Sequence, residues 1–140
     1  MSRDELLAGL NELLEAERAG MLVALHTAKE MEGESKSLLM RVHHDEARWC
    51  VLLRKTILHL HGTPSIETGS FHGKAVAITD LDQRLKFLNR GQAWVIRKLE
   101  PVINAMDEPG IKAELMEMLD AHKANISLLE AHLQPPPAAG

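Results

Sequence analysis

The sequence predicts an all-α protein that folds as an antiparallel four-helix bundle. Apolar residues recur at alternating spacings of three and four, which is the pattern of a helix with one buried stripe. Four such segments follow one another, and stretches with glycine or proline separate them. Hydrophobic residues make up 45% of the 140 residues, which is enough for the core of one domain.

We expect the four helices over residues 4–31, 35–61, 79–106 and 108–133, with ends that are accurate to a few residues. Serine or aspartate is the expected cap of the first helix, and threonine or aspartate that of the third. A proline lies in the first turn of the fourth helix, where proline is favourable. Pro101 falls inside the third helix and is expected to kink or loosen its last turns.

The connections between these helices predict their order in space. Short links join the first helix to the second and the third to the fourth, so each pair should be antiparallel. Residues 62–78 form a long link between the second and third helices, which can cross the length of the bundle. We therefore expect one domain over residues 1–133. Residues 134–140, QPPPAAG, cannot continue a helix and are expected to form a flexible tail.

Composition excludes several classes of function. The net charge is −4 and no basic stripe is present, so nucleic acid is not an expected partner. The apolar runs are too short to cross a membrane, and the N-terminus lacks the pattern of a signal peptide, so we expect a cytoplasmic protein. The single cysteine excludes an internal disulfide, and the absence of tyrosine excludes a tyrosyl radical or a phenolate ligand.

Each apolar stripe contains one polar interruption near the middle of its helix. These are Glu17, Glu46, Gln92 and His122, and Asn125 lies one turn after the last. Antiparallel helices of similar length bring their midpoints to one level, so these side chains should meet in one buried layer. Two buried carboxylates in such a layer need a metal ion, a shared proton or a positive partner.

Two interpretations of this layer are open. In the first, Glu17, Glu46 and His122 bind a metal ion, and His43 is a fourth ligand or a hydrogen-bonding neighbour. Carboxylate and imidazole donors suit iron, manganese or zinc. In the second, no metal is bound, and Glu46 hydrogen-bonds to His122 and Gln92 in a layer that only fixes the register of the helices. A small-molecule pocket at this level is a third alternative.

Four segments carry a resemblance to a known group of proteins. LLEAERAG (13–20), HHDEARWC (43–50), FLNRGQAWVIRKLEP (87–101) and MLDAHKANISLLE (118–130) resemble the ferritin-like superfamily, which includes bacterioferritin and rubrerythrin. More narrowly, TGSFHGKA followed by LNRGQAW looks like a small ferritin-like family with an incomplete di-iron motif. The resemblance implies a ferritin-like bundle over nearly the whole chain.

The resemblance also implies a set of ligands, which this sequence matches only in part. In the superfamily the first helix gives one glutamate, and Glu17 matches it. The second helix gives Glu-x-x-His, of which Glu46 is present but Trp49 stands at the histidine position. An indole does not ligate a metal, so by this resemblance Trp49 would occupy the space of a second ion, and the alternative is that Trp49 is simply an aromatic residue of the core.

The other two helices depart further from the superfamily pattern. The third gives a lone glutamate, and Gln92 occupies that level here. The fourth gives another Glu-x-x-His, which reads His122-x-x-Asn125 in this chain. The resemblance therefore implies at most a mononuclear site, in which Gln92 and Asn125 act as hydrogen-bonding partners.

These observations lead to a ferritin-like protein with a reduced carboxylate and histidine metal site, which binds one iron, manganese or zinc ion or no metal. The alternative is a non-catalytic homodimeric interaction module. A third class, a di-metal oxidoreductase of oxidative stress or iron metabolism, lacks several ligands. A homodimer is expected because Val23, Leu52 and Leu58 are taken to lie on outer faces.

Four further residues have ordinary structural expectations. Cys50 borders the stripe and is expected to be an inert thiol. His44 and Asp45 should lie on a solvated face or a dimer contact, and Trp94 should be a core or interface residue.

Overall fold

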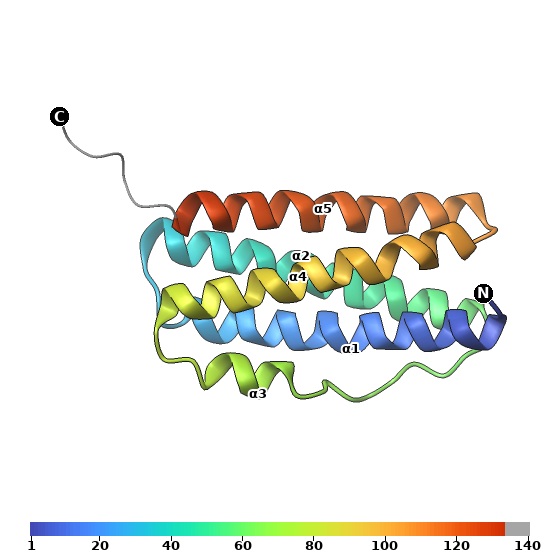
Figure 1. The fold of residues 1–140 in the computed structure, drawn as a ribbon, viewed down its shortest axis with the longest axis horizontal. Helices are drawn as coiled ribbons and strands as arrows, with labels where there is room; N and C mark the ends of the chain where they lie inside the picture. Colours follow the sequence, from blue (N-terminus) through green and yellow to red (C-terminus); the bar gives the residue numbers. More distant parts are fainter. Residues whose placement is uncertain (134–140) are drawn as a thin grey trace.

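The computed structural model describes residues 1–133 and consists of helices and their connections (Figure 1). Four long helices form the bundle, and a fifth, short helix lies in the crossover. The residues of the predicted tail, 134–140, lie outside the described part. The helices are α1 (Arg3–Ala28), α2 (Gly33–His59), α3 (Phe71–Val76), α4 (Leu81–Ala105) and α5 (Pro109–Leu133).

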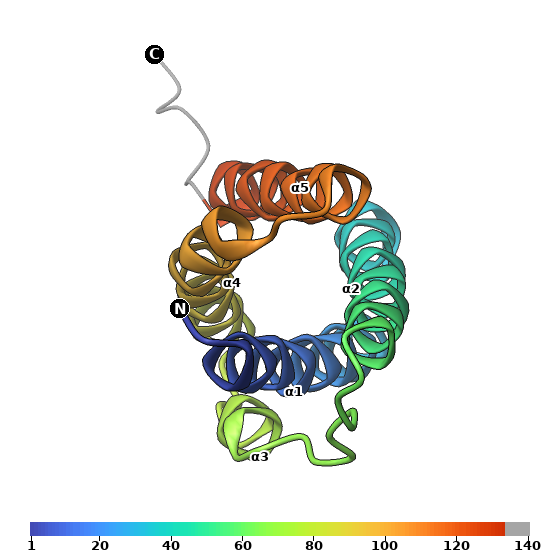
Figure 2. The same ribbon diagram turned by 90° about the vertical axis from the view of Figure 1, so that its right-hand side faces the viewer.

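The predicted topology is confirmed. Figure 2 looks along the bundle and shows the four long helices as a ring, with α3 outside it against α1. The α1–α2 and α4–α5 pairs are antiparallel hairpins, and the long crossover joins α2 to α4 (Figure 1). None of the helices in residues 1–133 has an apolar stretch long enough to cross a membrane.

Side-chain caps fix the start of two of the helices. Ser2 caps α1: the backbone N–H of Glu5 donates to Ser2 Oγ at 3.1 Å, and the Glu5 side chain accepts from the Ser2 N–H. Asp80 caps α4 by accepting from the backbone N–H of Gln83 at 3.0 Å. Gly33, with φ of 64°, makes the turn between α1 and α2, which a residue with a side chain adopts only at a cost.

The crossover follows α1 because polar side chains of α1 bind its backbone. Arg18 donates to the carbonyl oxygens of Ser65 and Glu67, and the Asn11 side chain exchanges two hydrogen bonds with residues 63 and 65. The short helix α3 was not predicted, because six residues are too few for a helical period to be visible. Phe71 of α3 packs on Gly91 of α4, where an added Cβ would lie 2.7 Å from the phenyl ring.

Two hydrophobic clusters form the core, one on each side of the middle of the bundle. The larger cluster consists of leucines, isoleucines, valines, methionines and Trp49 near the N-terminal half of α1. The smaller cluster lies near the C-terminal half of α1 and includes Val23, Leu39, Leu88 and Leu129. Along each long helix, the buried polar residues near the middle separate the residues of one hydrophobic cluster from those of the other.

A second buried polar cluster lies at the start of α4. The Arg84 guanidinium is buried and donates from Nε to the carbonyl oxygen of Ile78 at 2.9 Å. It also reaches Thr27 Oγ1 at 3.4 Å and forms an ion pair with Glu30 of α1. These bonds join the end of the crossover to α1. The cluster was not predicted from the sequence, because Arg84 lies beside the apolar stripe of its helix and not within it.

Two of the residues expected on outer faces are buried. Val23 and Leu52 belong to the two core clusters, so the expectation that they lie on the surface was wrong. Leu58 is 50% exposed and Val51 is 67% exposed, and both lie on α2. The homodimer therefore stays a prediction that now depends on these two exposed residues.

Candidate metal site

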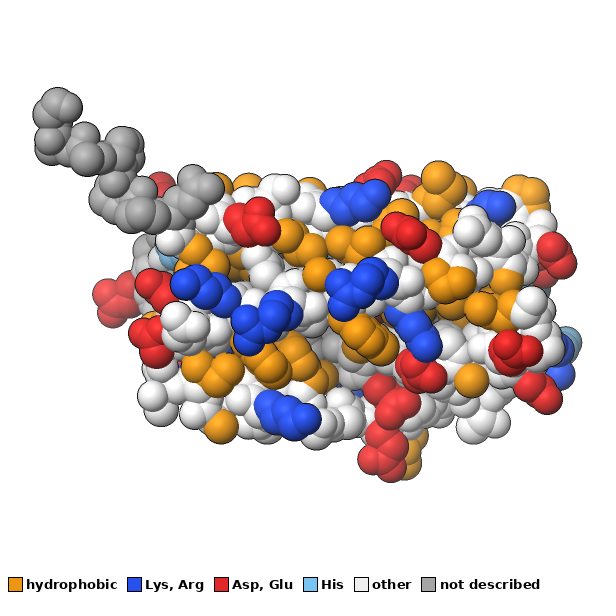
Figure 3. Space-filling model, in the orientation of Figure 1, with side chains coloured by type: hydrophobic (Ala, Val, Ile, Leu, Met, Phe, Trp, Pro, Cys, Tyr) orange, Lys and Arg blue, Asp and Glu red, His pale blue; other side chains and the backbone are white. Residues whose placement is uncertain are grey.

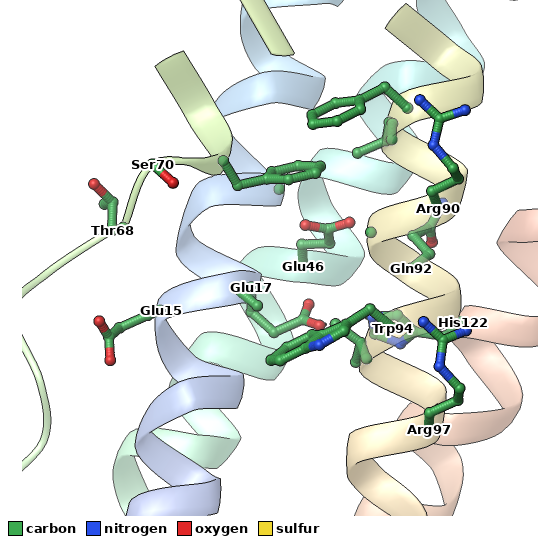
Figure 4. Close-up of a pocket in the computed structure, with 18 residues that line it drawn as sticks. Glu15, Glu17, Glu46, Thr68, Ser70, Arg90, Gln92, Trp94, Arg97 and His122 are labelled. Carbon is green, nitrogen blue, oxygen red and sulfur yellow. Dashed lines mark hydrogen bonds and ion pairs between the residues drawn. The ribbon is translucent and has the colours of Figure 1, made fainter. Parts of the chain in front are cut away.

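Glu17, Glu46 and His122 meet in the middle of the bundle. They come from α1, α2 and α5, and none is more than 3% exposed. One ligand atom from each lies within 4.8 Å of those of the other two. Figure 4 shows the carboxylates of Glu17 and Glu46 between α1 and α4, in front of α2. Three of the predicted mid-helix polar residues therefore bring atoms of metal-binding types together in a buried place.

A backbone carbonyl fixes the tautomer of His122. The Nδ1 atom lies 2.8 Å from the carbonyl oxygen of Met118, which can only accept, so Nδ1 carries a proton and donates it. The other ring nitrogen, Nε2, lies 2.7 Å from Oε1 of Glu17. Nε2 is thus the atom that faces the carboxylates, either with a proton shared with Glu17 or with a free lone pair.

Burial and crowding of charge shift the pKa values of this group. Desolvation raises the pKa of Glu46 well above its ordinary value, and the nearby charges of Glu17 and Asp45 add to the increase. Desolvation alone would lower the pKa of His122, but the charge and hydrogen bond of Glu17 more than compensate, so the pKa is raised. Without a metal ion, the cluster therefore retains protons that water-exposed groups would release.

The backbone of α1 leaves room for the Glu46 carboxylate. At Gly20, one turn after Glu17, an added Cβ would lie 2.8 Å from Cδ of Glu46 and would collide with Oε2. Any other residue at position 20 would displace this carboxylate. Oε2 of Glu17 and Oε1 of Gln92 are buried and have no hydrogen-bond partner within residues 1–133. Orphaned acceptor oxygens of this kind call for a cation or a donor that the protein itself does not supply.

The structure places His43 outside this group. Its Nδ1 lies 2.9 Å from the carbonyl oxygen of Met21 on α1, and the side chain is half-buried. Asn125 also has a different partner, because its Nδ2 donates to Oδ2 of Asp45 at 3.2 Å. Asp45 is half-buried by this contact, so its expected place on a solvated face was wrong.

Gln92 forms a hydrogen bond with Asn89, a residue outside the predicted polar layer. Its Nε2 donates to Oδ1 of Asn89 at 3.0 Å, and Nδ2 of Asn89 donates to the carbonyl oxygen of Ile126 at 3.2 Å. The expected hydrogen bonds from Glu46 to His122 and Gln92 are not found among residues 1–133. Glu17, instead of Glu46, is the hydrogen-bonding partner of His122.

Trp49 and Cys50 lie beside the site and have structural roles. Trp49 is buried in the larger hydrophobic cluster, and the Arg48 guanidinium lies 4.5 Å from the centre of its ring. Burial, with the charges of Glu17 and Glu46, raises the pKa of the Cys50 thiol to about 12. Such a thiol holds its proton at neutral pH and is a poor nucleophile.

A pocket of about 550 Å³ reaches from the surface to the cluster. It opens between α1 and α4, next to the crossover, and Glu17, Glu46 and His122 line its inner part (Figure 4). Trp94 lines it as well and is 38% exposed, so Trp94 is a pocket residue and not one of the core. A small-molecule pocket at this level was one of the alternatives, but its lining was not predicted, because part of its wall comes from residues of the crossover.

The architecture and the buried carboxylate and histidine cluster together define a ferritin-like helical bundle. The chain belongs to the family described as Domain of unknown function (DUF6306), whose model matches residues 4–131. No curated protein matches the chain.

Two solved structures share this fold. A crystal structure of ferritin-like, diiron-carboxylate proteins from Bacillus anthracis str. Ames superposes with a TM-score of 0.84 at 21% identity, covering 96% of this chain and 100% of that one. The other is a two-domain protein from Anabaena variabilis ATCC 29413, with DJ-1/ThiJ/PfpI-like and ferritin-like domains. Its TM-score is 0.71 at 14% identity, and the match covers 100% of this chain but 42% of that one. These likenesses establish the fold.

Proposed function

We propose that the protein binds one transition metal ion in the core of its ferritin-like bundle, through Glu17, Glu46 and His122. The observation that carries the proposal is the convergence of two carboxylates and one imidazole within 4.8 Å in a buried site. Iron, manganese and zinc all accept this donor set.

The surroundings of the three residues fit an ion better than they fit protons alone. A cation would neutralise the two carboxylates whose crowding raises the pKa of Glu46. It would also give a partner to Oε2 of Glu17, which has none within the described residues. The hydrogen bond from His122 Nδ1 to Met118 keeps Nε2 directed at the carboxylates, as metal-binding histidines require.

The donor set supports one ion and not two. A di-metal centre needs further carboxylates, and Gln92 and Asn125 offer only amides. The nearby Asp45 carboxylate accepts a hydrogen bond from Asn125 and is not part of the group of three ligand atoms. The protein from Bacillus anthracis is described as a diiron-carboxylate protein, but at 21% identity that likeness concerns the fold. A di-metal oxidoreductase is accordingly less well supported by this chain.

A bound ion would supply Lewis-acid chemistry, or redox chemistry if it is iron or manganese. The residues of the chain determine what reaches it. Hydrophobic clusters lie on both sides of the three residues, and the pocket between α1 and α4 gives a route from solvent. This arrangement suits a small molecule that enters beside α4.

A second candidate is a metal-free structural layer in a homodimeric interaction module. Hydrogen bonds from Asn89 to Ile126 and from Asn125 to Asp45 link α4, α5 and α2 without any ion. The exposed Val51 and Leu58 on α2 give such a module an apolar surface. In this alternative the two glutamates contribute only to the register of the helices.

Isothermal titration calorimetry with Mn²⁺ and Zn²⁺ separates the two candidates. We expect binding to wild-type protein and a loss of affinity of at least about tenfold in Glu17→Gln and Glu46→Gln, since each removes an anionic ligand. Glu100→Gln, at an exposed position of α4, is the matched control and should bind as wild type does. Equal affinity in all four proteins would contradict the metal site and favour the structural layer.

A further inference from the structure

The pocket above the candidate metal site concentrates the aromatic residues of the chain. The sequence contains two phenylalanines, two tryptophans and no tyrosine. Phe71, Phe87 and Trp94 all line this pocket, and Trp49 alone lies elsewhere. Phe71 and Phe87 stack on each other at 4.8 Å between ring centres, with 11° between their planes. A wall of flat apolar rings favours a flat apolar ligand.

Two arginines border the same pocket without partners of their own. Arg90 and Arg97 lie two turns apart on α4, with Trp94 between them, and all three line the pocket (Figure 4). Neither arginine forms a hydrogen bond or ion pair with any residue of 1–133. Figure 3 shows that lysine and arginine side chains form a row over α4 on this face. The net charge of the chain is −4, so this row is a local feature and not a consequence of overall charge.

The arginines give the pocket a preference for an anion. Guanidinium groups bind carboxylates through paired hydrogen bonds, and the planar group also stacks on aromatic rings. The Arg90 guanidinium lies 5.5 Å from the centre of the Phe87 ring, so one arginine is already held against the aromatic wall. A carboxylate at the mouth would meet these charges while the rest of the molecule faces Phe71, Phe87 and Trp94.

Gln92 adds a requirement for a hydrogen-bond donor. The carbonyl oxygen of Ile126 can only accept a hydrogen bond, so the Asn89 amide directs Nδ2 toward that oxygen. The other atom of the amide, Oδ1, therefore faces Gln92. Gln92 then uses its nitrogen on Asn89, which leaves Oε1 buried, without a partner among residues 1–133, in the wall of the pocket. This fixed acceptor costs free energy unless a ligand or water donates to it.

From these three features we infer that the pocket binds a planar aromatic carboxylate that carries a hydrogen-bond donor on its ring. The carboxylate pairs with Arg90 and Arg97, the ring lies against Phe71, Phe87 and Trp94, and the donor reaches Oε1 of Gln92. The inner end of such a ligand faces Glu17 and Glu46 and would be the part that a bound metal ion acts on. The inference rests on the pocket and not on the metal, so each can fail without the other.

The test uses 4-hydroxybenzoate as the probe and isothermal titration calorimetry as the measurement, on protein treated with EDTA and on the same protein with added Zn²⁺. Three comparison compounds each lack one feature: benzoate lacks the donor, 4-hydroxybenzyl alcohol lacks the carboxylate, and trans-4-hydroxycyclohexanecarboxylate lacks the flat ring. We expect 4-hydroxybenzoate to bind most tightly and each comparison compound to lose about fivefold to tenfold or more.

Variants assign each contact. Arg90→Gln and Arg97→Gln should each weaken 4-hydroxybenzoate binding about tenfold and leave 4-hydroxybenzyl alcohol unchanged, because a charged hydrogen bond is lost. Arg54→Gln, at an exposed position of α2 away from the pocket, is the matched control and should bind as wild type does. All three positions are exposed, so these variants should fold, and circular dichroism checks this.

Gln92→Leu should remove the preference for 4-hydroxybenzoate over benzoate while benzoate itself binds as before. If metal-free protein binds 4-hydroxybenzoate, and the ligand changes and variants weaken that binding as expected, the result supports the pocket even if no metal site exists. No binding of any aromatic acid at millimolar concentration, with or without Zn²⁺, would overturn the inference. Equal losses in Arg54→Gln and the two pocket variants would overturn it as well.

Discussion

Within residues 1–133, the buried guanidinium of Arg84 and the buried cluster of Glu17, Glu46 and His122 differ in how fully their charged groups are paired. Around Arg84, the guanidinium donates to Ile78 and Thr27 and forms an ion pair with Glu30. In the middle of the bundle, Glu17 bonds to His122 but retains an unpartnered oxygen, and Glu46 has no hydrogen-bonding side chain among residues 1–133. The first cluster is complete without a ligand, whereas the second lacks a cation.

This difference distinguishes a structural cluster from a binding site. Burying a charge is costly unless its partners are present, so a paired cluster contributes to stability and an unpaired cluster reduces it. The middle cluster also has the clearance at Gly20 and an open pocket, and neither would be needed for stability.

Arg84→Met should lower the free energy of unfolding by about 2 kcal/mol, because it leaves the buried Thr27 hydroxyl and the half-buried carbonyl of Ile78 without their donor, while the exposed Glu30 carboxylate is hydrated. Glu46→Gln should cost much less, and in metal-free protein it should be neutral or stabilising. Urea denaturation of both variants provides the measurement. A larger loss for Glu46→Gln than for Arg84→Met would reverse the comparison.

Gly20→Ala should displace the Glu46 carboxylate. We expect a loss of about 1–2 kcal/mol of stability from overpacking, together with a loss of affinity for Mn²⁺ of about tenfold or more. Gly110→Ala on α5, where an added Cβ meets nothing within 4 Å, is the control. It should leave metal binding unchanged and gain up to about 1 kcal/mol, since alanine favours helix. Equal behaviour of the two variants would show that Gly20 makes no special room.

The metal-free protein should become less stable as the pH rises from about 4.5 to 8. The pKa of Glu46 is raised in the folded state above its ordinary 4.5, so the folded chain keeps a proton that the unfolded chain releases. The pKa of His122 is raised above 6.5, so its contribution is full below that pH and is lost as the pH rises through the folded value. Both effects have the same sign.

Urea denaturation at a series of pH values in EDTA measures this slope. Glu46→Gln should flatten it, because the variant no longer exchanges that proton. A saturating metal ion should also remove the decline, since it replaces the protons. Stability of metal-free wild type that rises steadily across this range would contradict the charge assignment of the cluster.

The smallest effect is expected at Cys50. Because the pKa of its thiol is raised to about 12, folded protein should react negligibly with Ellman's reagent at pH 8, while protein in guanidinium chloride reacts with one thiol per chain. Absorbance at 412 nm follows the reaction. Rapid reaction of the folded protein would mean that Cys50 is more accessible and more acidic than the packing indicates.

The four long helices could be predicted from the sequence because their apolar residues follow a helical period. The level of the polar residues could be predicted as well, because each of these residues interrupts that period near the middle of its helix. The pairing inside that level was not predictable. Whether Glu17 or Glu46 meets His122 depends on the rotation of each helix by a fraction of a turn. The clearance at Gly20 depends on the same rotation, since it concerns a carboxylate from another helix.

The residues that line the pocket could not be predicted from the sequence either, for a different reason. Phe71 lies in a six-residue helix with no readable period, and it meets Phe87 only because Arg18 and Asn11 hold the crossover along α1. Trp94 has the same spacing pattern as a core or interface residue, and its place at the pocket follows from where the crossover ends. Long-range placement of an irregular segment leaves little trace in local spacing.

The metal content of the purified protein tests directly whether Glu17, Glu46 and His122 bind a single ion. Elemental mass spectrometry should be performed on protein purified without a tag or chelator, beside Glu46→Ala. The account predicts about one iron, manganese or zinc per chain in wild type and its loss in the variant. Two ions per chain would contradict a mononuclear site. No metal even after reconstitution, with Glu46→Ala changing only stability, would contradict the site itself.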